Sequence, residues 1–167
     1  MTQAPAGEAP VTGFFHAGVT VTDLDRSLTF YRDLLGMEVS MERVFTEPYI
    51  FEIVALQPAA LRIAYLKIPQ SPVIVELIEF QGIERHPGSA RPCDPGTGHF
   101  CLYVRDVDAL HARLTANGFT SRSAAPVTIT AGPNRGSKVV YVSDPDGYLV
   151  ELFERRTASA VTEGRLA

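Results

Sequence analysis

Two histidines and two glutamates are the residues of this sequence best suited to hold a metal ion. They are His16, Glu76, His99 and Glu151. Each glutamate lies in a short apolar segment, where the alternation of side chains along a strand would give it apolar neighbours on its own face. An isolated carboxylate in such surroundings costs on the order of several kcal/mol, so a nearby cation would stabilise it. Two imidazoles and two carboxylates suit one divalent Zn, Ni, Co, Fe or Mn ion.

The four residues occur in an internal repeat. Segment 16–25 aligns with segment 99–108, and both copies begin with histidine and share two aspartates. Segment 74–78 aligns with segment 149–153, and both carry glutamate at the third position. A single histidine or strand glutamate is more often a structural residue, and that alternative stays open for each of the four. Their recurrence in matching places favours a metal site, because repeated units place equivalent side chains in equivalent positions.

Each half of the chain has the pattern of one strand, one helix and three further strands. Asp23 and Asp106 can cap the two helices, and Gly36 and Gly118 can end them. Alternating, β-branched and aromatic residues predict the strands. These are 15–21, 49–54, 61–66 and 73–80 in the first half, then one starting at His99, 127–130, 138–143 and 148–153 in the second. The sequence Asp-Pro-Asp-Gly at 144–147 predicts a hairpin turn.

These patterns divide the chain into five segments. Residues 13–80 and 99–156 form the first and second βαβββ modules, and the Gly- and Pro-containing residues 81–98 link them. Residues 1–12 and 157–167 are predicted to be flexible tails. The start of the chain has neither the basic nor the apolar stretch of a secretory signal.

Composition excludes several classes of function. The chain has 167 residues, a formal net charge of −4 and no cluster of Lys and Arg, which argues against nucleic acid as a partner. No apolar run approaches the ~20 residues of a membrane span. Two cysteines are too few for a disulfide framework and suit a reducing compartment. We therefore expect a soluble cytoplasmic protein with a small-molecule partner.

Five further residues are candidates for contact with that small molecule. Cys101 and Tyr103 share the strand face of His99. Asn134, Arg135 and Lys138 lie in the loop 131–138 and could bind an anionic or carbonyl-bearing group. For Cys101, a role as a small core residue is an equal alternative to substrate contact. For segment 131–138, the alternative is an exposed basic loop with no binding role.

Two motifs resemble the vicinal oxygen chelate superfamily, which includes glyoxalases, bleomycin-resistance proteins and extradiol dioxygenases. Residues 22–37 are similar to the first helix of that superfamily, and residues 144–152 to its closing hairpin. The resemblance implies an α+β fold in which two βαβββ modules form a mostly antiparallel eight-stranded cup with the helices outside. It places metal ligands on the first and last strands of each module, at His16, Glu76, His99 and Glu151. It also implies a homodimer.

The same resemblance implies an activity. Members share chelation of a substrate through neighbouring oxygens, and a complete ligand set favours a metal-dependent isomerase, epimerase or lyase. Such an enzyme moves a proton next to a carbonyl through a metal-stabilised enolate or enediolate, with Glu76 and Glu151 as the catalytic candidates. Two alternatives stay open. One is an Fe(II) extradiol-type dioxygenase, and the other is a protein that only binds a small molecule such as an antibiotic.

Overall fold

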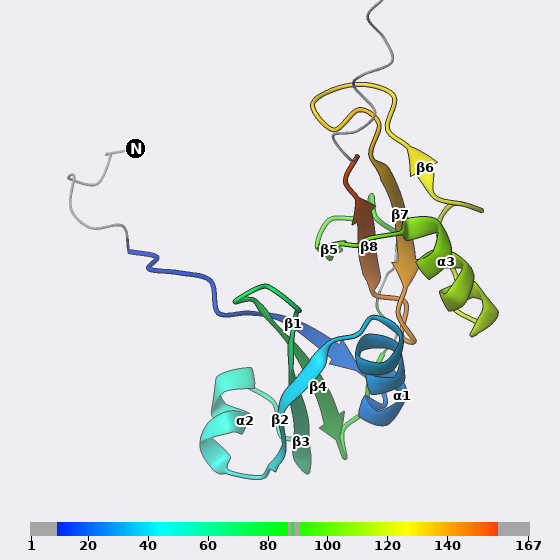
Figure 1. Cartoon of the computed structure of the whole chain (residues 1–167). Helices are drawn as coiled ribbons and strands as arrows, with labels where there is room; N and C mark the ends of the chain where they lie inside the picture. The colour runs from blue at the N-terminus through cyan, green and yellow to red at the C-terminus, as the bar shows by residue number, and fades with distance from the viewer. Residues whose placement is uncertain (1–9, 87, 89–90, 157–167) are drawn as a thin grey trace, which may run out of the picture.

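The computed structural model describes residues 10–86, 88 and 91–156, which form two similar modules (Figure 1). Each module contains one four-stranded sheet and at least one helix. Most of the predicted tails, residues 1–9 and 157–167, lie outside the described residues. No helix in the described ranges is long and apolar enough to cross a membrane.

The first module begins with the strand that carries His16 and ends with the strand that carries Glu76. Its elements are β1 (His16–Val21), α1 (Leu24–Leu28), η1 (Thr29–Leu34), β2 (Glu38–Phe45), α2 (Pro48–Val54), β3 (Ala60–Lys67) and β4 (Ile74–Gln81). The strand order in the sheet is β1-β4-β3-β2. The first and last strands of the module, β1 and β4, are therefore parallel neighbours, although 52 residues, 22–73, lie between them in the chain.

The second module repeats this arrangement. Its elements are β5 (His99–Tyr103), α3 (Val107–Ala116), β6 (Val127–Thr128), β7 (Lys138–Ser143) and β8 (Leu149–Glu154). The strand order is β5-β8-β7-β6, again with the first and last strands parallel and the other pairings antiparallel. The α+β fold with two βαβββ modules is confirmed. Within the described residues, the eight strands form two sheets of four.

The predicted helix boundaries are confirmed by their capping contacts. Asp23 accepts a hydrogen bond from the backbone N–H of Arg26 at 3.0 Å, and Asp106 accepts one from Ala109 at 2.8 Å. Such bonds satisfy N–H groups that the first turn of a helix leaves unpaired. Gly36 has a φ of 76°, the left-handed conformation that suits a residue just after a helix.

The glutamates on the helix-facing side of the sheets also hold the helices. Glu79 of β4 accepts a hydrogen bond from the N–H of Leu24 at 3.0 Å. Glu154 of β8 accepts one from Val107 at 2.8 Å. Each module thus uses alternate positions of its last strand differently: Glu76 and Glu151 lie on one face, and the capping glutamates lie on the other.

One predicted strand is wrong. Residues 49–54 form the helix α2, and the second strand of the first module is β2, at Glu38–Phe45. Pro48 stands at the start of the helix, where its fixed φ and missing N–H are tolerated. Ala55 ends the helix in the left-handed conformation, with a φ of 53°. The aromatic and β-branched composition of α2 favours a strand, but this local preference does not decide the structure.

A single apolar core joins the two modules on the helix side of both sheets. It includes Leu24 and Leu77 from the first module and Val107 and Leu152 from the second, all fully buried. Packing continues across the boundary through Phe30, whose ring centroid lies 4.8 Å from that of Phe119. The helices therefore lie on the faces opposite to the histidine–glutamate pairs.

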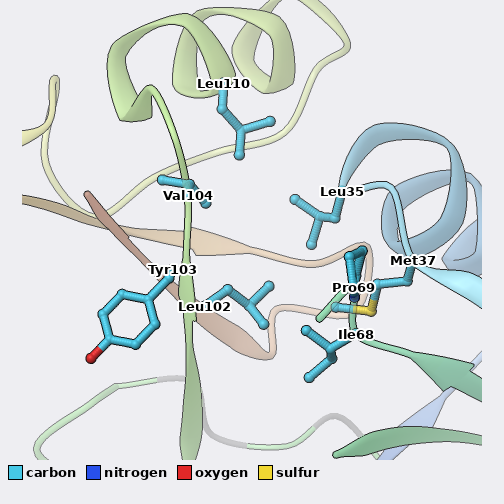
Figure 2. Close-up of a pocket in the computed structure, with 8 residues that line it drawn as sticks. All are labelled: Leu35, Met37, Ile68, Pro69, Leu102, Tyr103, Val104 and Leu110. Carbon is cyan, nitrogen blue, oxygen red and sulfur yellow. The ribbon is translucent and has the colours of Figure 1, made fainter. Parts of the chain in front are cut away.

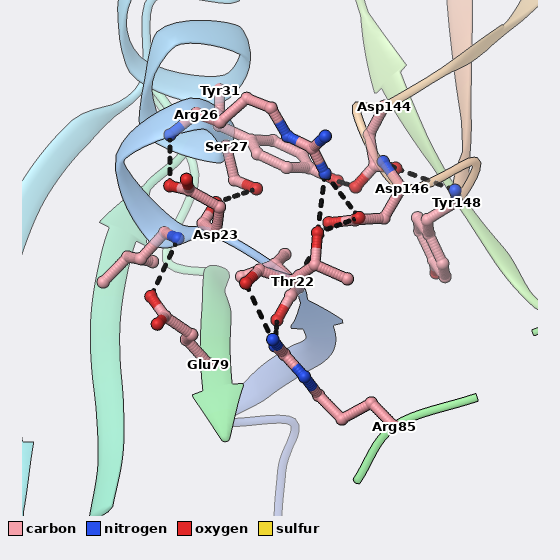
Figure 3. Close-up of polar contacts among 12 residues, drawn as sticks. Thr22, Asp23, Arg26, Ser27, Tyr31, Glu79, Arg85, Asp144, Asp146 and Tyr148 are labelled. Carbon is pink, nitrogen blue, oxygen red and sulfur yellow. Dashed lines mark hydrogen bonds and ion pairs between the residues drawn. The ribbon is translucent and has the colours of Figure 1, made fainter. Parts of the chain in front are cut away.

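A polar contact fixes the closing hairpin of the second module against the first helix of the first module (Figure 3). The hydroxyl of Tyr31 donates to the buried carboxylate of Asp144 at 2.9 Å, and Arg26 binds Asp146 at 2.5 Å. Burial raises the pKa of Asp144, and the hydrogen bond from Tyr31 opposes that shift. The shared core and this contact hold the modules in one arrangement.

Candidate metal centre

The first histidine–glutamate pair forms because β1 and β4 are parallel neighbours. His16 Nε2 lies 3.0 Å from Glu76 Oε2, and Glu76 is only 8% exposed. Gly18 is the register partner of Glu76 on β1. A Cβ atom at Gly18 would lie 3.5 Å from Glu76 Oε2, so the glycine keeps the space beside the carboxylate open.

The second pair repeats this geometry in the second module. His99 Nε2 lies 3.2 Å from Glu151 Oε2, across the parallel strands β5 and β8. The hydroxyl of Tyr141 lies 3.1 Å from the same carboxylate oxygen and 3.2 Å from His99 Nε2. This pair is more exposed than the first, because 41% of the His99 side chain is accessible, compared with 30% of His16.

Each glutamate also has a tyrosine opposite it on the adjacent antiparallel strand. Tyr65 of β3 pairs in register with Glu76, and Tyr141 of β7 pairs with Glu151. Burial raises the pKa of both phenols, and the neighbouring carboxylate adds to the shift. Both hydroxyls therefore remain hydrogen-bond donors at neutral pH. Neither tyrosine was predicted from the sequence, although each lies opposite the glutamate, on the strand that precedes the glutamate strand.

The two pairs differ in the residue that lies beside the glutamate on the histidine strand. Cys101 stands beside Glu151 on β5, where the first module has Gly18 beside Glu76. Burial, together with the nearby Glu151 carboxylate, raises the pKa of the Cys101 thiol to about 11. The thiol therefore stays neutral at physiological pH. It lies on the same face of the sheet as the predicted ligands His99 and Glu151.

The two pairs remain separate within one chain. In the described part of the chain, no group of three or more His, Cys, Asp or Glu residues is placed to hold a metal ion together. His16 is brought to Glu76, and His99 is brought to Glu151, but each pair lies on a different sheet. Each chain therefore presents two half-sites, each with one imidazole and one carboxylate.

The chemistry of each half-site fits a divalent transition metal. A histidine nitrogen and a carboxylate oxygen at 3.0 to 3.2 Å converge on the same space, and both are ligands for Zn and related ions. The buried Nδ1 of His16 has no hydrogen-bond partner among the described residues, so no such contact dictates which ring nitrogen carries the proton. Two half-sites together would supply four ligands.

The remaining candidate residues occupy different surroundings. Tyr103 and Asn134 line an open pocket of about 310 Å³ at the end of β8. Lys138 forms an ion pair with Asp108 of α3. Arg135 is exposed in the loop before β7.

A second pocket lies between the modules and is chemically unlike the half-sites (Figure 2). Its volume is about 120 Å³, and its lining is mostly aliphatic, with Leu35 and Ile68 from the first module and Leu102 and Leu110 from the second. The ring of Tyr103 points away from the other labelled side chains in Figure 2. This pocket offers no acid, base or metal ligand.

Comparisons with known proteins agree with the fold. A model of the Glyoxalase/Bleomycin resistance protein/Dioxygenase superfamily matches residues 13–152. A lactoylglutathione lyase from Arabidopsis thaliana is 31% identical over 145 residues, which are 85% of this chain but only 44% of that protein. A 2-epi-5-epi-valiolone epimerase from an Actinomyces species is 32% identical over 142 residues, 83% of this chain and 76% of that protein. The solved structure of a glyoxalase family protein from Bacillus cereus has a TM-score of 0.74 at 18% identity, and the match covers 93% of this chain and all of that one.

Proposed function

The chain belongs to the Glyoxalase/Bleomycin resistance protein/Dioxygenase superfamily, and on that premise we propose that it is a metal-dependent isomerase, epimerase or lyase. The reaction moves a proton on a carbon next to a carbonyl group. The observation that carries the proposal is the occurrence of the same histidine–glutamate–tyrosine arrangement in both modules. Relatives named as a lyase and as an epimerase support this class of reaction.

His16, Glu76, His99 and Glu151 would hold one divalent transition metal ion. When bound, the ion would supply Lewis-acid polarisation to a substrate that chelates it through neighbouring oxygens. A free carboxylate that is 8% exposed, as Glu76 is, would be costly without a cation or hydrogen bonds. A bound cation would add to the stabilisation that His16 and Tyr65 already give this carboxylate.

Glu76 is the proposed proton carrier, and Glu151 is the equivalent candidate in the second module. Each carboxylate lies beside a histidine and a tyrosine, which can orient it. A carboxylate held close to the carbon that loses its proton can act as general base and then return the proton as general acid. An enzyme that inverts a stereocentre could use both glutamates, one on each face of the substrate.

The complete site is proposed to form between two chains. Each half-site provides two ligands, while a transition metal site ordinarily needs three or four from the protein. The modules of one chain are held by a common core and by the Tyr31–Asp144 contact, so they are not free to bring their half-sites together. Phe14 and Phe15, next to His16, are 69% and 61% exposed and would be covered by a second copy.

Solvent exchange tests the activity. Metal-loaded protein is incubated in D₂O with α-hydroxy and α-keto carbonyl compounds, including lactoylglutathione and 2-epi-5-epi-valiolone, which are the compounds in the relatives' names. Deuterium should appear at the carbon next to the carbonyl. Oxygen consumption with catechols, without such exchange, would replace the proposal by a dioxygenase. Tight binding with neither reaction would replace it by a binding protein.

A further inference from the structure

The pocket at the end of β8 carries positive charge that the metal chemistry does not require. Arg155 and Arg156 line it, together with Asn134, Tyr103 and Phe153. In Figure 1, the loop between β6 and β7 arches over the end to which β8 points. The pocket has a volume of about 310 Å³, enough for a carboxylate or phosphate group and part of the molecule that bears it.

Both arginines are held by neighbouring groups. The guanidinium carbon of Arg155 lies 3.7 Å from the centroid of the Tyr103 ring, a cation–π contact that orients it. The backbone N–H of Arg156 donates a hydrogen bond to the Ser137 hydroxyl at 3.2 Å. The Arg156 stem also packs over Gly136, where a Cβ atom would lie 3.4 Å from the arginine Cδ.

Neither guanidinium has an acidic partner in the described part of the chain. No described carboxylate forms an ion pair with Arg155 or Arg156, whereas Arg26, Arg43 and Arg62 each have one. The adjacent Glu154 points to the other face of β8 and caps α3. Guanidinium groups bind carboxylate and phosphate through two parallel hydrogen bonds, so two such groups without acidic partners suit an anion.

The pocket lies on the same sheet face as the second half-site. Phe153 follows Glu151 by two residues on β8, and Tyr103 follows Cys101 by two residues on β5, so each pair shares a face. Two residues of a strand span about 7 Å, and the four from Glu151 to Arg155 span about 13 Å. One small molecule could therefore reach both the half-site and the arginines.

The first module lacks this charge. Aligning Glu76 with Glu151 places Phe80 and Gln81 opposite Arg155 and Arg156. The basic pair is thus not part of the repeated arrangement that would hold the metal. A feature confined to one module is what an asymmetric substrate would need, since only one of its ends carries the group to be recognised.

We propose that Arg155 and Arg156, with the Asn134 amide, bind a carboxylate or phosphate group of the substrate about 7–13 Å from the half-site. This inference rests on the proposed function, because it names the substrate class of the same site. It selects anionic carbonyl compounds over neutral ones of the same size.

Inorganic phosphate is the first probe. It is titrated into metal-free ¹⁵N-labelled protein at constant ionic strength, so the outcome is independent of catalysis. Amide shifts should concentrate on Asn134, Arg155 and Arg156, and the affinity should fall about 10- to 100-fold in the double variant Arg155→Gln/Arg156→Gln. Arg43→Gln removes the same kind of charge in the first module and should leave binding unchanged. Shifts that survive in the double variant, or that weaken equally in Arg43→Gln, overturn the proposal.

A competition experiment then shows whether the pocket binds only free phosphate or also the anionic group of a larger compound. Lactoylglutathione and fructose 6-phosphate are compared with the diethyl ester of the former and with fructose. At least one of the anionic compounds should displace phosphate, and its counterpart without an anionic group should not. If neither displaces it, or if the compounds with and without an anionic group compete equally, the pocket does not bind the substrate's anionic group. Failure of deuterium exchange would instead remove the proposed function and leave these binding results intact.

Discussion

The two modules share their histidine, glutamate and tyrosine but differ in what surrounds them. His16, Glu76 and Tyr65 occupy the same strand positions as His99, Glu151 and Tyr141. Around these shared residues, the first module has Gly18 and an uncharged end of β4. The second module has Cys101 and, after β8, Arg155 and Arg156. The shared residues suit a metal ion that takes equivalent ligands from two half-sites. The differing residues suit a substrate with two unlike ends.

The largest expected effect is on the two glutamates, and it would show whether they are equivalent. Glu76→Gln preserves the shape and one oxygen ligand but removes the base, so the rate should fall by at least ~10²-fold while metal is retained. Steady-state rates and elemental analysis measure the two quantities. Glu151→Gln is the matched variant: an equal loss indicates that both carry protons, and a much smaller loss assigns the base to Glu76. Full activity in both variants would contradict proton transfer by these residues.

Removal of the Tyr31–Asp144 contact between the modules should give the next largest effect. Tyr31→Phe removes a hydrogen bond to a buried carboxylate and should lower the free energy of unfolding by about 1.5–3 kcal/mol. Chemical denaturation measures this loss. Tyr148→Phe is the control, because its hydroxyl makes no hydrogen bond within the described residues, and it should change stability by less than about 0.5 kcal/mol.

The pH dependence of the Tyr31 variant follows from Asp144. Burial already raises the pKa of Asp144 in the folded protein, and loss of the opposing Tyr31 hydroxyl raises it further. The destabilisation is therefore complete at pH values above the folded-state pKa of the variant. It decreases as the pH falls below that value, because the carboxyl of the variant is then protonated. It is smallest below the folded-state pKa of the unmodified protein, where the carboxyl is protonated with or without the hydroxyl. An equal loss at acidic and neutral pH would contradict the role given to Asp144.

The tyrosines test whether the second half-site is the more dependent on its hydrogen bonds. Tyr141 contacts both Glu151 and His99, so Tyr141→Phe should weaken metal binding or activity about 10- to 100-fold, as is usual for groups that orient metal ligands. Competition with a chelator of known affinity measures the change. Tyr65→Phe is the counterpart in the first module and should have the smaller effect. The reverse order would overturn this ranking.

The smallest effect is expected at Lys138. Its ammonium group is held by Asp108 on the exposed side of α3, where solvent screens the ion pair, so Lys138→Gln should leave the free energy of unfolding close to that of the unmodified protein. Turnover should stay close to that of the unmodified protein. A large rise in KM would instead support the substrate contact expected from the sequence.

Repetition explains why much of this fold was predictable. The helix caps at Asp23 and Asp106 and the glycine stops depend on local chemistry, and both modules show them. The helix α2 was missed because its aromatic and β-branched residues favour a strand, while β2 was overlooked although Val39, Met41 and Phe45 fall on alternate positions. Local preference failed most clearly at α2, which has no counterpart among the described elements of the second module.

The candidate site was predictable only in part. The histidines and glutamates stood out because an acid in an apolar strand needs a partner. Tyr65 and Tyr141 did not, since a tyrosine in a strand has an ordinary structural role and only the register with the glutamates reveals the contact. Arg155 and Arg156 follow the last strand, and their place beside the 131–137 loop depends on tertiary structure.

Complementation between two inactive variants tests the central claim, that each metal centre combines one half-site from each of two chains. One variant is His16→Ala/Glu76→Ala, and the other is His99→Ala/Glu151→Ala. Each alone should bind no metal tightly and show no turnover. After unfolding and refolding together, half of the dimers should be mixed, and each should hold one intact site of two, restoring about a quarter of the metal and activity. Two variants altered in the same half-site should restore nothing. A site built within one chain predicts no recovery in any mixture, and that result would contradict the account.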